Sequence, residues 1–161
     1  MKKLFLIALA VSSLSACKKD SENSPSKTDL LTSKKWRITA DTETSTTTIT
    51  GSAPVTTTTN QYATTAACEK DNYTQFNNNK TLVLDEGASK CSSNDPQQTT
   101  GTWDLSSDQT KLTVGVSGTT GTNTLDVLEL TASTLRLRQS YSYTTTGATY
   151  SGTSETTFTS F

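Results

Sequence analysis

Three cysteines carry the most readily predicted chemistry of this chain. Cys17 ends an apolar N-terminal leader, whereas Cys68 and Cys91 lie on either side of a strand–turn–strand pattern. Two cysteines that bracket a hairpin are typical of a disulfide across a β-sheet in an oxidising compartment. Modification of Cys17 leaves the other two as an even pair with no free thiol. We therefore expect a Cys68–Cys91 bridge.

The N-terminal leader is expected to direct export and processing and not to form part of the fold. Lys2 and Lys3 precede an apolar run, Leu4 to Val11, that is too short to span a bilayer, and small residues then lead to Cys17. This ending resembles the bacterial lipobox, whose cysteine is diacylated and becomes the new N-terminus. The resemblance implies a signal peptide over residues 1–16 and two or three acyl chains, enough for a stable anchor at ~0.8 kcal/mol per buried methylene. The alternative is an ordinary secretory signal with a chance cysteine.

A short tether follows the leader, so residues 17–28 are expected to comprise the lipidated cysteine and a flexible linker. Residues 18–22, KKDSE, resemble the export signal that sends some lipoproteins of the Bacteroidota to the outer face of the outer membrane. A solvated tether is the alternative. We expect a lipid-anchored protein of the outer membrane, on its periplasmic or its cell-surface face.

Other reactive side chains are in poor positions for catalysis. The chain has no histidine, and no serine of residues 29–161 lies in a G-x-S-x-G or S-x-x-K context. Asp85 and Glu86 are neighbours on a predicted strand, so their carboxylates are expected on opposite faces. Glu69, Asp71 and Asn72 match no calcium loop, which favours a solvated turn. We expect no enzymatic activity, no metal and no cofactor.

The composition indicates one β-domain over residues 29–161. The 161-residue chain is 31% hydrophobic with a net charge of −1, which gives no basic surface for nucleic acid. Threonine is abundant, and its branched Cβ favours extended backbone. Residues 42–65 are nearly all Thr and Ser around a Gly/Pro turn, which predicts two strands, 44–50 and 55–62. With few apolar groups, this hairpin is expected to be the least rigid part.

Further strands follow at regular spacing. Thr28 is expected to cap a helical turn, and a second helical turn is expected over residues 66–71. In the turn 77–80, we expect an asparagine to adopt positive φ. Alternating apolar residues then predict strands over residues 73–76, 81–86, 101–105, 111–116, 124–130, 134–143 and 149–161. Eight to ten short strands with turn-sized gaps argue for an antiparallel barrel or sandwich.

Several short motifs occur together in one order: LLTSKKW, a cysteine before a strand ending in Phe76, NKT, Cys91, GTWDLSSDQTKLTV and ELTASTLRLR. Together they resemble the lipocalin-like domain of small bacterial lipoproteins, over Asp29 to Arg138. Ser33 and the Asn79–Lys80 pair stand where glycine is common in that family. The resemblance implies an all-β, up-and-down antiparallel barrel of about eight strands with a Cys68–Cys91 bridge. It implies no particular ligand.

Inward-facing positions of such a barrel are the candidate ligand contacts, although each is equally a core position. We expect them to be Trp36, Phe76, Leu84, Trp103, Val114 and Leu137.

Polar and aromatic residues near the C-terminus allow two interpretations. Arg136 and Arg138 lie opposite the apolar stripe, either as a clasp for an anionic ligand or as exposed arginines, one of which stacks on Trp36. Three tyrosines line a pocket mouth or cover the barrel wall: Tyr141, Tyr143 and Tyr150.

We therefore expect a monomeric, non-catalytic lipoprotein that binds a small apolar ligand or a partner at the outer membrane. The alternative is a structural or adhesive surface lipoprotein whose Thr-rich loops contact glycans or proteins, with no internal pocket. An apolar void larger than a few waters would favour the first hypothesis, and a side-chain-filled barrel would favour the second.

Overall fold

A computed structural model describes residues 24–161. The predicted signal peptide (1–16), the lipidation site Cys17 and the export-like segment 18–22 lie outside the described residues. Within residues 24–161, no helix has both the length and the apolar character needed to cross a membrane.

Nine strands and three short helices make up the described chain. They are α1 (Lys27–Thr32), β1 (Lys35–Ile49), β2 (Val55–Asn60), α2 (Gln61–Thr64), the 3₁₀ helix η1 (Ala67–Glu69), β3 (Tyr73–Phe76), β4 (Thr81–Asp85), β5 (Gln98–Leu105), β6 (Lys111–Val116), β7 (Asn123–Leu130), β8 (Thr134–Thr145) and β9 (Ala148–Ser160).

Eight of the strands close into an antiparallel barrel. The order is β1-β3-β4-β5-β6-β7-β8-β9, and pairing of β9 with β1 completes the ring. This confirms the all-β fold with an eight-stranded up-and-down barrel. The ninth strand, β2, pairs only with the far half of β1, from Thr42 to Thr47.

The core fills the end of the barrel that α1 covers. Trp36 is fully buried and donates its indole N–H to the Leu31 carbonyl at 2.9 Å, which fixes α1 over that end. Trp103 packs edge-on against Phe76 and donates its own indole N–H to the Asn77 carbonyl. The buried apolar side chains are Leu31, Trp36, Phe76, Leu82, Trp103, Leu112, Leu135 and Leu137.

Local details correct several expectations from the sequence. Ser26, not Thr28, caps α1, because its hydroxyl accepts the Asp29 amide and the Asp29 carboxylate accepts the Ser26 amide in return. The positive φ of the turn at 77–80 falls on Lys80 rather than on an asparagine. The strand expected over 44–50 is the far half of β1, and β2 ends at Asn60, whose side chain caps α2.

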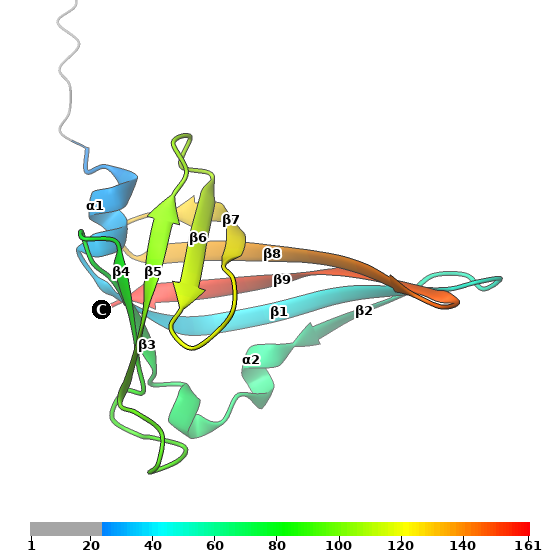
Figure 1. Cartoon of the computed structure of the whole chain (residues 1–161), viewed down its shortest axis with the longest axis horizontal. Coiled ribbons are helices and arrows are strands. Elements are labelled where there is room, and N and C mark those ends of the chain that lie inside the picture. Colours follow the sequence, from blue (N-terminus) through cyan, green and yellow to red (C-terminus); the bar gives the residue numbers. More distant parts are fainter. Residues whose placement is uncertain (1–23) are drawn as a thin grey trace, which may run out of the picture.

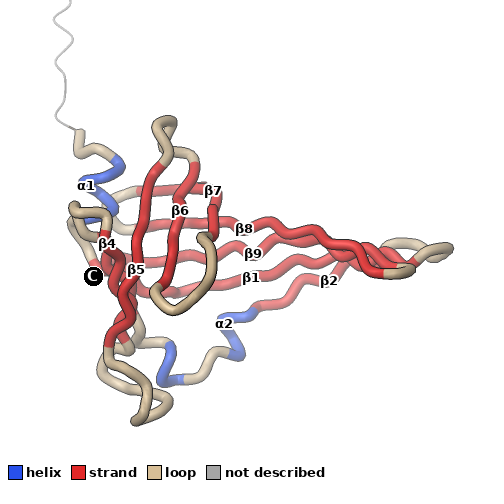
Figure 2. The backbone as a smooth tube through the Cα atoms, viewed as in Figure 1, coloured by secondary structure: helices blue, strands red, loops and turns tan. Residues whose placement is uncertain are grey.

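A long sheet extends away from the barrel (Figures 1 and 2). We call it the finger: residues 42–60 of β1, β2 and their connecting turn, with residues 139–154 of β8, β9 and theirs. Its strand order is β2-β1-β9-β8, and no residue of the finger is buried. Strand alternation from buried Leu137 places Tyr141 and Tyr143 on the face that continues the barrel interior. The opposite face carries almost only Thr and Ser.

Candidate functional site

An apolar cavity of about 150 Å³ lies inside the barrel, bordered by part of the buried core. Four of the six predicted ligand contacts line it: Phe76, Leu84, Val114 and Leu137. The full lining is Thr74, Phe76, Leu82, Leu84, Leu112, Val114, Val116, Leu125, Leu137 and Phe158. A volume of this size corresponds to about five waters, yet almost nothing in the wall offers a polar partner to water.

The two tryptophans have different positions from the other four candidates. Trp103 packs in the core and lies outside the cavity lining. Trp36 lies between the core and a second hollow of about 220 Å³, the side pocket, which Leu84 also lines.

The side pocket exists because the barrel wall is weakly joined between β1 and β3. Only Lys35 and Trp36 of β1 pair with β3, so the chain beyond Trp36 separates from it. The side pocket shares Thr74 and Leu84 with the interior cavity, so the two hollows adjoin through these side chains.

An outer groove of about 310 Å³ continues from the side pocket toward solvent. It shares Ile38, Glu69 and Asn72 with the side pocket, and Tyr62 and Thr65 of the α2 region form its far wall. Interior cavity, side pocket and outer groove therefore lie next to one another in this order, from the barrel interior to its side.

The Cys68–Cys91 disulfide holds the covering segment in place. It joins η1 to the loop between β4 and β5, as expected from the sequence. The Asp71 carboxylate reinforces this junction, because it accepts the amides of Ala88 and Ser89, each at 2.9 Å. Gly87 is required beside it: its φ is +67°, and a Cβ there would lie 2.5 Å from the Asp71 carbonyl oxygen.

Asp85 is the most constrained polar group of the side pocket. Its side chain is 7% exposed and accepts hydrogen bonds from Gln98, Gln97, the Tyr73 hydroxyl and the Gly87 amide, at 2.7 to 3.0 Å. Burial raises the pKa of the Asp85 carboxyl, but these four donors outweigh it and lower the pKa to about 2. A permanent negative charge therefore lies in the wall of this hollow.

Further carboxylates surround the same opening. Glu69 and Glu86 line the side pocket, and Asp41 lines the outer groove with Glu69. Glu86 follows the last residue of β4, so strand alternation no longer separates it from Asp85. Within residues 24–161, none of these four carboxylates forms an ion pair.

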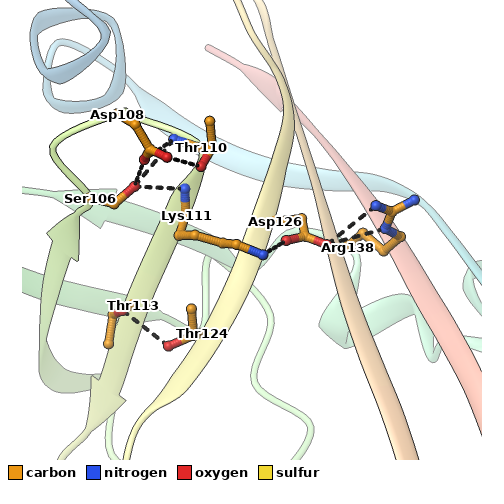
Figure 3. Close-up of polar contacts among 8 residues, drawn as sticks. All are labelled: Ser106, Asp108, Thr110, Lys111, Thr113, Thr124, Asp126 and Arg138. Carbon is orange, nitrogen blue, oxygen red and sulfur yellow. Dashed lines mark hydrogen bonds and ion pairs between the residues drawn. The ribbon is translucent and has the colours of Figure 1, made fainter.

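Carboxylates on the outer wall of the barrel differ in this respect. Asp126 lies between Lys111 and Arg138 (Figure 3), and Arg136 pairs with Glu155 at 3.3 Å and Glu129 at 3.7 Å. Arg136 and Arg138 are thus engaged on the outer surface, away from the interior cavity. Their position fits exposed arginines rather than a ligand clasp.

The three C-terminal tyrosines stand on the finger, away from the interior cavity. Tyr141 donates to Glu43 at 2.9 Å, a hydrogen bond that raises the pKa of Tyr141, and Tyr143 stacks between Tyr141 and Tyr150. They line none of the three hollows described above.

Sequence reasoning missed the side opening. Ile38, Glu69 and Asn72 belong to it because the disulfide and α2 bring residues 61–72 across a gap in the wall. The cysteine pair was the available signal that this segment is fixed to the barrel. Within the described residues, no three acidic or cysteine side chains are grouped so as to hold a metal ion.

A family model described as a lipocalin-like domain matches residues 32–137, which span β1 to the first four residues of β8. No curated protein matches the chain.

Proposed function

The chain belongs to the lipocalin-like domain family, and on that premise we propose that it is a non-catalytic binding protein for a small, largely apolar ligand. The apolar interior cavity carries this proposal, because a barrel built only as a scaffold would be filled by side chains. The apolar end of the ligand occupies the interior cavity, and its other end lies in the side pocket. One chain forms the complete site, so ligand binding itself requires only a monomer.

The carboxylates of the opening restrict the polar end of the ligand. Asp85 keeps its charge at neutral pH, and Asp41, Glu69 and Glu86 have no cationic partner within the described chain. An anionic head group would be repelled there, whereas a neutral or cationic one would not. Lys35 and Lys70 also lie beside these hollows, but the carboxylates outnumber them, so we infer an apolar ligand with an uncharged or positively charged end in preference to a fatty acid.

Absence of catalysis belongs to the same proposal. The sequence contains no histidine, and Asp85 is held as a carboxylate far from the pKa of a general base or acid working at neutral pH.

We further propose that the protein is a lipoprotein of the Bacteroidota type, attached to the outer membrane through Cys17. The lipobox-like leader and the export-like segment 18–22 support this. The Cys17→Ala variant should leave the membrane fraction, and retention of an uncleaved chain in that fraction would contradict the anchor. Exchange of Asp20 and Glu22 for Ala should protect the protein from protease added to intact cells, unless residues 18–22 are only a tether.

Native mass spectrometry of protein purified from its membrane tests ligand binding directly. A non-covalent mass should accompany the chain, and dodecylamine and dodecanol should compete for the site far better than dodecanoate. The Val114→Phe variant should lose binding because the ring fills the interior cavity. The matched Val55→Phe variant places the same ring on the exposed finger and should bind normally.

Two outcomes would overturn the proposal: no bound mass together with no competitor binding, or equal binding by the two phenylalanine variants. The second hypothesis, contact with glycans or proteins, is supported by the exposed finger but does not account for the interior cavity.

A further inference from the structure

The finger leaves one strand edge without a neighbour. β7 pairs with β8 only as far as Arg138, so residues 139–145 of β8 have β9 on one side and no described strand on the other. Along this edge, backbone N–H and C=O groups are free to pair with a further strand.

The edge also lacks the features that normally prevent such pairing. Residues 139–154 contain no charged residue and no proline, and the register between β8 and β9 is regular from Thr134 to Ala148. Natural sheets protect long edges with lysine, proline or a bulge. The opposite edge of the finger, β2, is by contrast short and preceded by Pro54.

Exposed apolar side chains gather on the same part of the molecule. Ile49 is 55% exposed, Val55 65% and Tyr143 56%, and all three lie toward the end of the finger. Val55 pairs with Thr47, Thr47 with Tyr150 and Tyr150 with Tyr143, so one row of side chains crosses all four strands and ends at the free edge.

We propose that the free edge of β8 pairs antiparallel with the same edge of a second copy, about a two-fold axis at Ser142. This register places Tyr141 beside Tyr143 of the second copy, so the tyrosine stack continues across the joint. On the other face Ser140 lies beside Thr144 of the second copy. Aromatic pairs and hydroxyl pairs are both favourable cross-strand neighbours.

We choose a second copy of the chain as the partner because the free edge of β8 is complementary to itself. When residues 140–144 pair antiparallel with the same residues of a second copy, tyrosine lies beside tyrosine and hydroxyl side chains lie beside hydroxyl side chains. The segment carries no charge, so this arrangement causes no charge repulsion. An isologous pair of this kind closes after two copies. Pairing of β8 with the β2 edge of another copy would instead propagate into a filament. The dimer leaves the interior cavity and its side opening free, and goes beyond the ligand-binding role.

Cysteine cross-linking of the full chain tests the register. Opposed residues of an antiparallel pair have Cα atoms about 4.5–5.5 Å apart, within the range that a disulfide spans. The Ser142→Cys variant should therefore form a covalent dimer under mild oxidation. The Ser151→Cys variant, its matched control on β9, should stay monomeric on a non-reducing gel.

A mixture supplies a second, independent readout. Variants Ser140→Cys and Thr144→Cys should each remain uncross-linked alone, because each residue faces the other position, and should cross-link when mixed. A Ser142→Cys variant that fails to cross-link, whether the native chain is monomeric or dimeric by sedimentation, would overturn the proposal.

Charge on the edge should weaken the dimer selectively. The Ser142→Lys variant sets two lysines against each other, so the dissociation constant of the dimer should rise at least tenfold. The Ser151→Lys variant carries the same charge on the inner strand and should change it less than twofold. Equal effects of the two variants would place the contact elsewhere.

Discussion

The barrel and the finger share three strands, which pass through two different environments. β1, β8 and β9 begin or end in the barrel wall, where every buried apolar residue of these strands lies, and continue into the finger, where none is buried. In the barrel one face of each strand packs on the core. In the finger both faces of each strand are exposed to solvent, and the preference of threonine for extended backbone stabilises the strands.

Charge divides the two regions as sharply as burial. Glu43 is the one charged residue of the finger, whereas the barrel wall carries the ion pairs of Asp104, Asp126, Glu129 and Glu155. The difference shows that the length of these strands is not set by the size of the buried core. Burial ends where the barrel ends, and regular hydrogen bonding continues well beyond it.

The largest expected contrast is between an aromatic residue in each region. Trp103→Ala removes a buried ring that packs on Phe76 and loses its hydrogen bond to Asn77, so the free energy of unfolding should fall by about 3–5 kcal/mol. Tyr143→Ala removes an exposed ring, and its loss should be below about 1 kcal/mol. Denaturant unfolding of both variants at low protein concentration measures the contrast, and equal losses would show that the finger folds as part of the core.

The disulfide should contribute nearly as much. The bridge closes a loop with a sequence separation of 23, for which lost chain entropy corresponds to roughly 3 kcal/mol. The double variant Cys68→Ser, Cys91→Ser should therefore unfold at a markedly lower denaturant midpoint, and it should not affect the proposed attachment through Cys17. It should also bind the apolar ligand more weakly, because residues 61–72 lose their fixed position over the side pocket. Mass spectrometry of the non-reduced chain checks the premise, and two free thiols would refute it.

Acid should weaken the barrel through Asp85. Its pKa in the folded protein is about 2, below the ordinary value of 3.8, so its contribution is complete above about pH 5 and is lost as the pH falls from about 4 to about 2. The expected loss is about 2–3 kcal/mol, at ~1.4 kcal/mol per pKa unit. Asp85→Asn should be less stable at pH 7 and should show a flatter decline over that pH range. Parallel declines of the two proteins would exclude Asp85 as the cause.

Alternation and turn chemistry predicted the strands of an antiparallel barrel or sandwich, because period-two patterns such as Leu112-Thr113-Val114 record which face is buried. The choice of a barrel came from the family resemblance. Four of six pocket contacts followed from the same pattern. The side opening could not be predicted in this way. It depends on where the pairing of β1 with β3 ends, and this long-range contact has no local sequence signal. The finger was half predicted: its Thr-rich hairpin was recognised, but the matching extension of β8 and β9 was not separated from the barrel strands.

The smallest expected effect distinguishes local from global stability. Two threonine pairs have the same cross-strand hydrogen bond, Thr46 with Thr56 in the finger at 2.8 Å and Thr113 with Thr124 in the barrel wall at 3.1 Å (Figure 3). Each pair should contribute only a few tenths of a kcal/mol. Thr113→Val should shift global unfolding by that amount, because β6 opens only when the barrel unfolds. Thr46→Val should leave global unfolding unchanged and increase only the hydrogen exchange of finger amides, since a sheet without a core opens locally. Exchange measured by mass spectrometry separates the two regions. Finger amides as protected as those of β5 and β6 would mean that the finger opens only with the barrel.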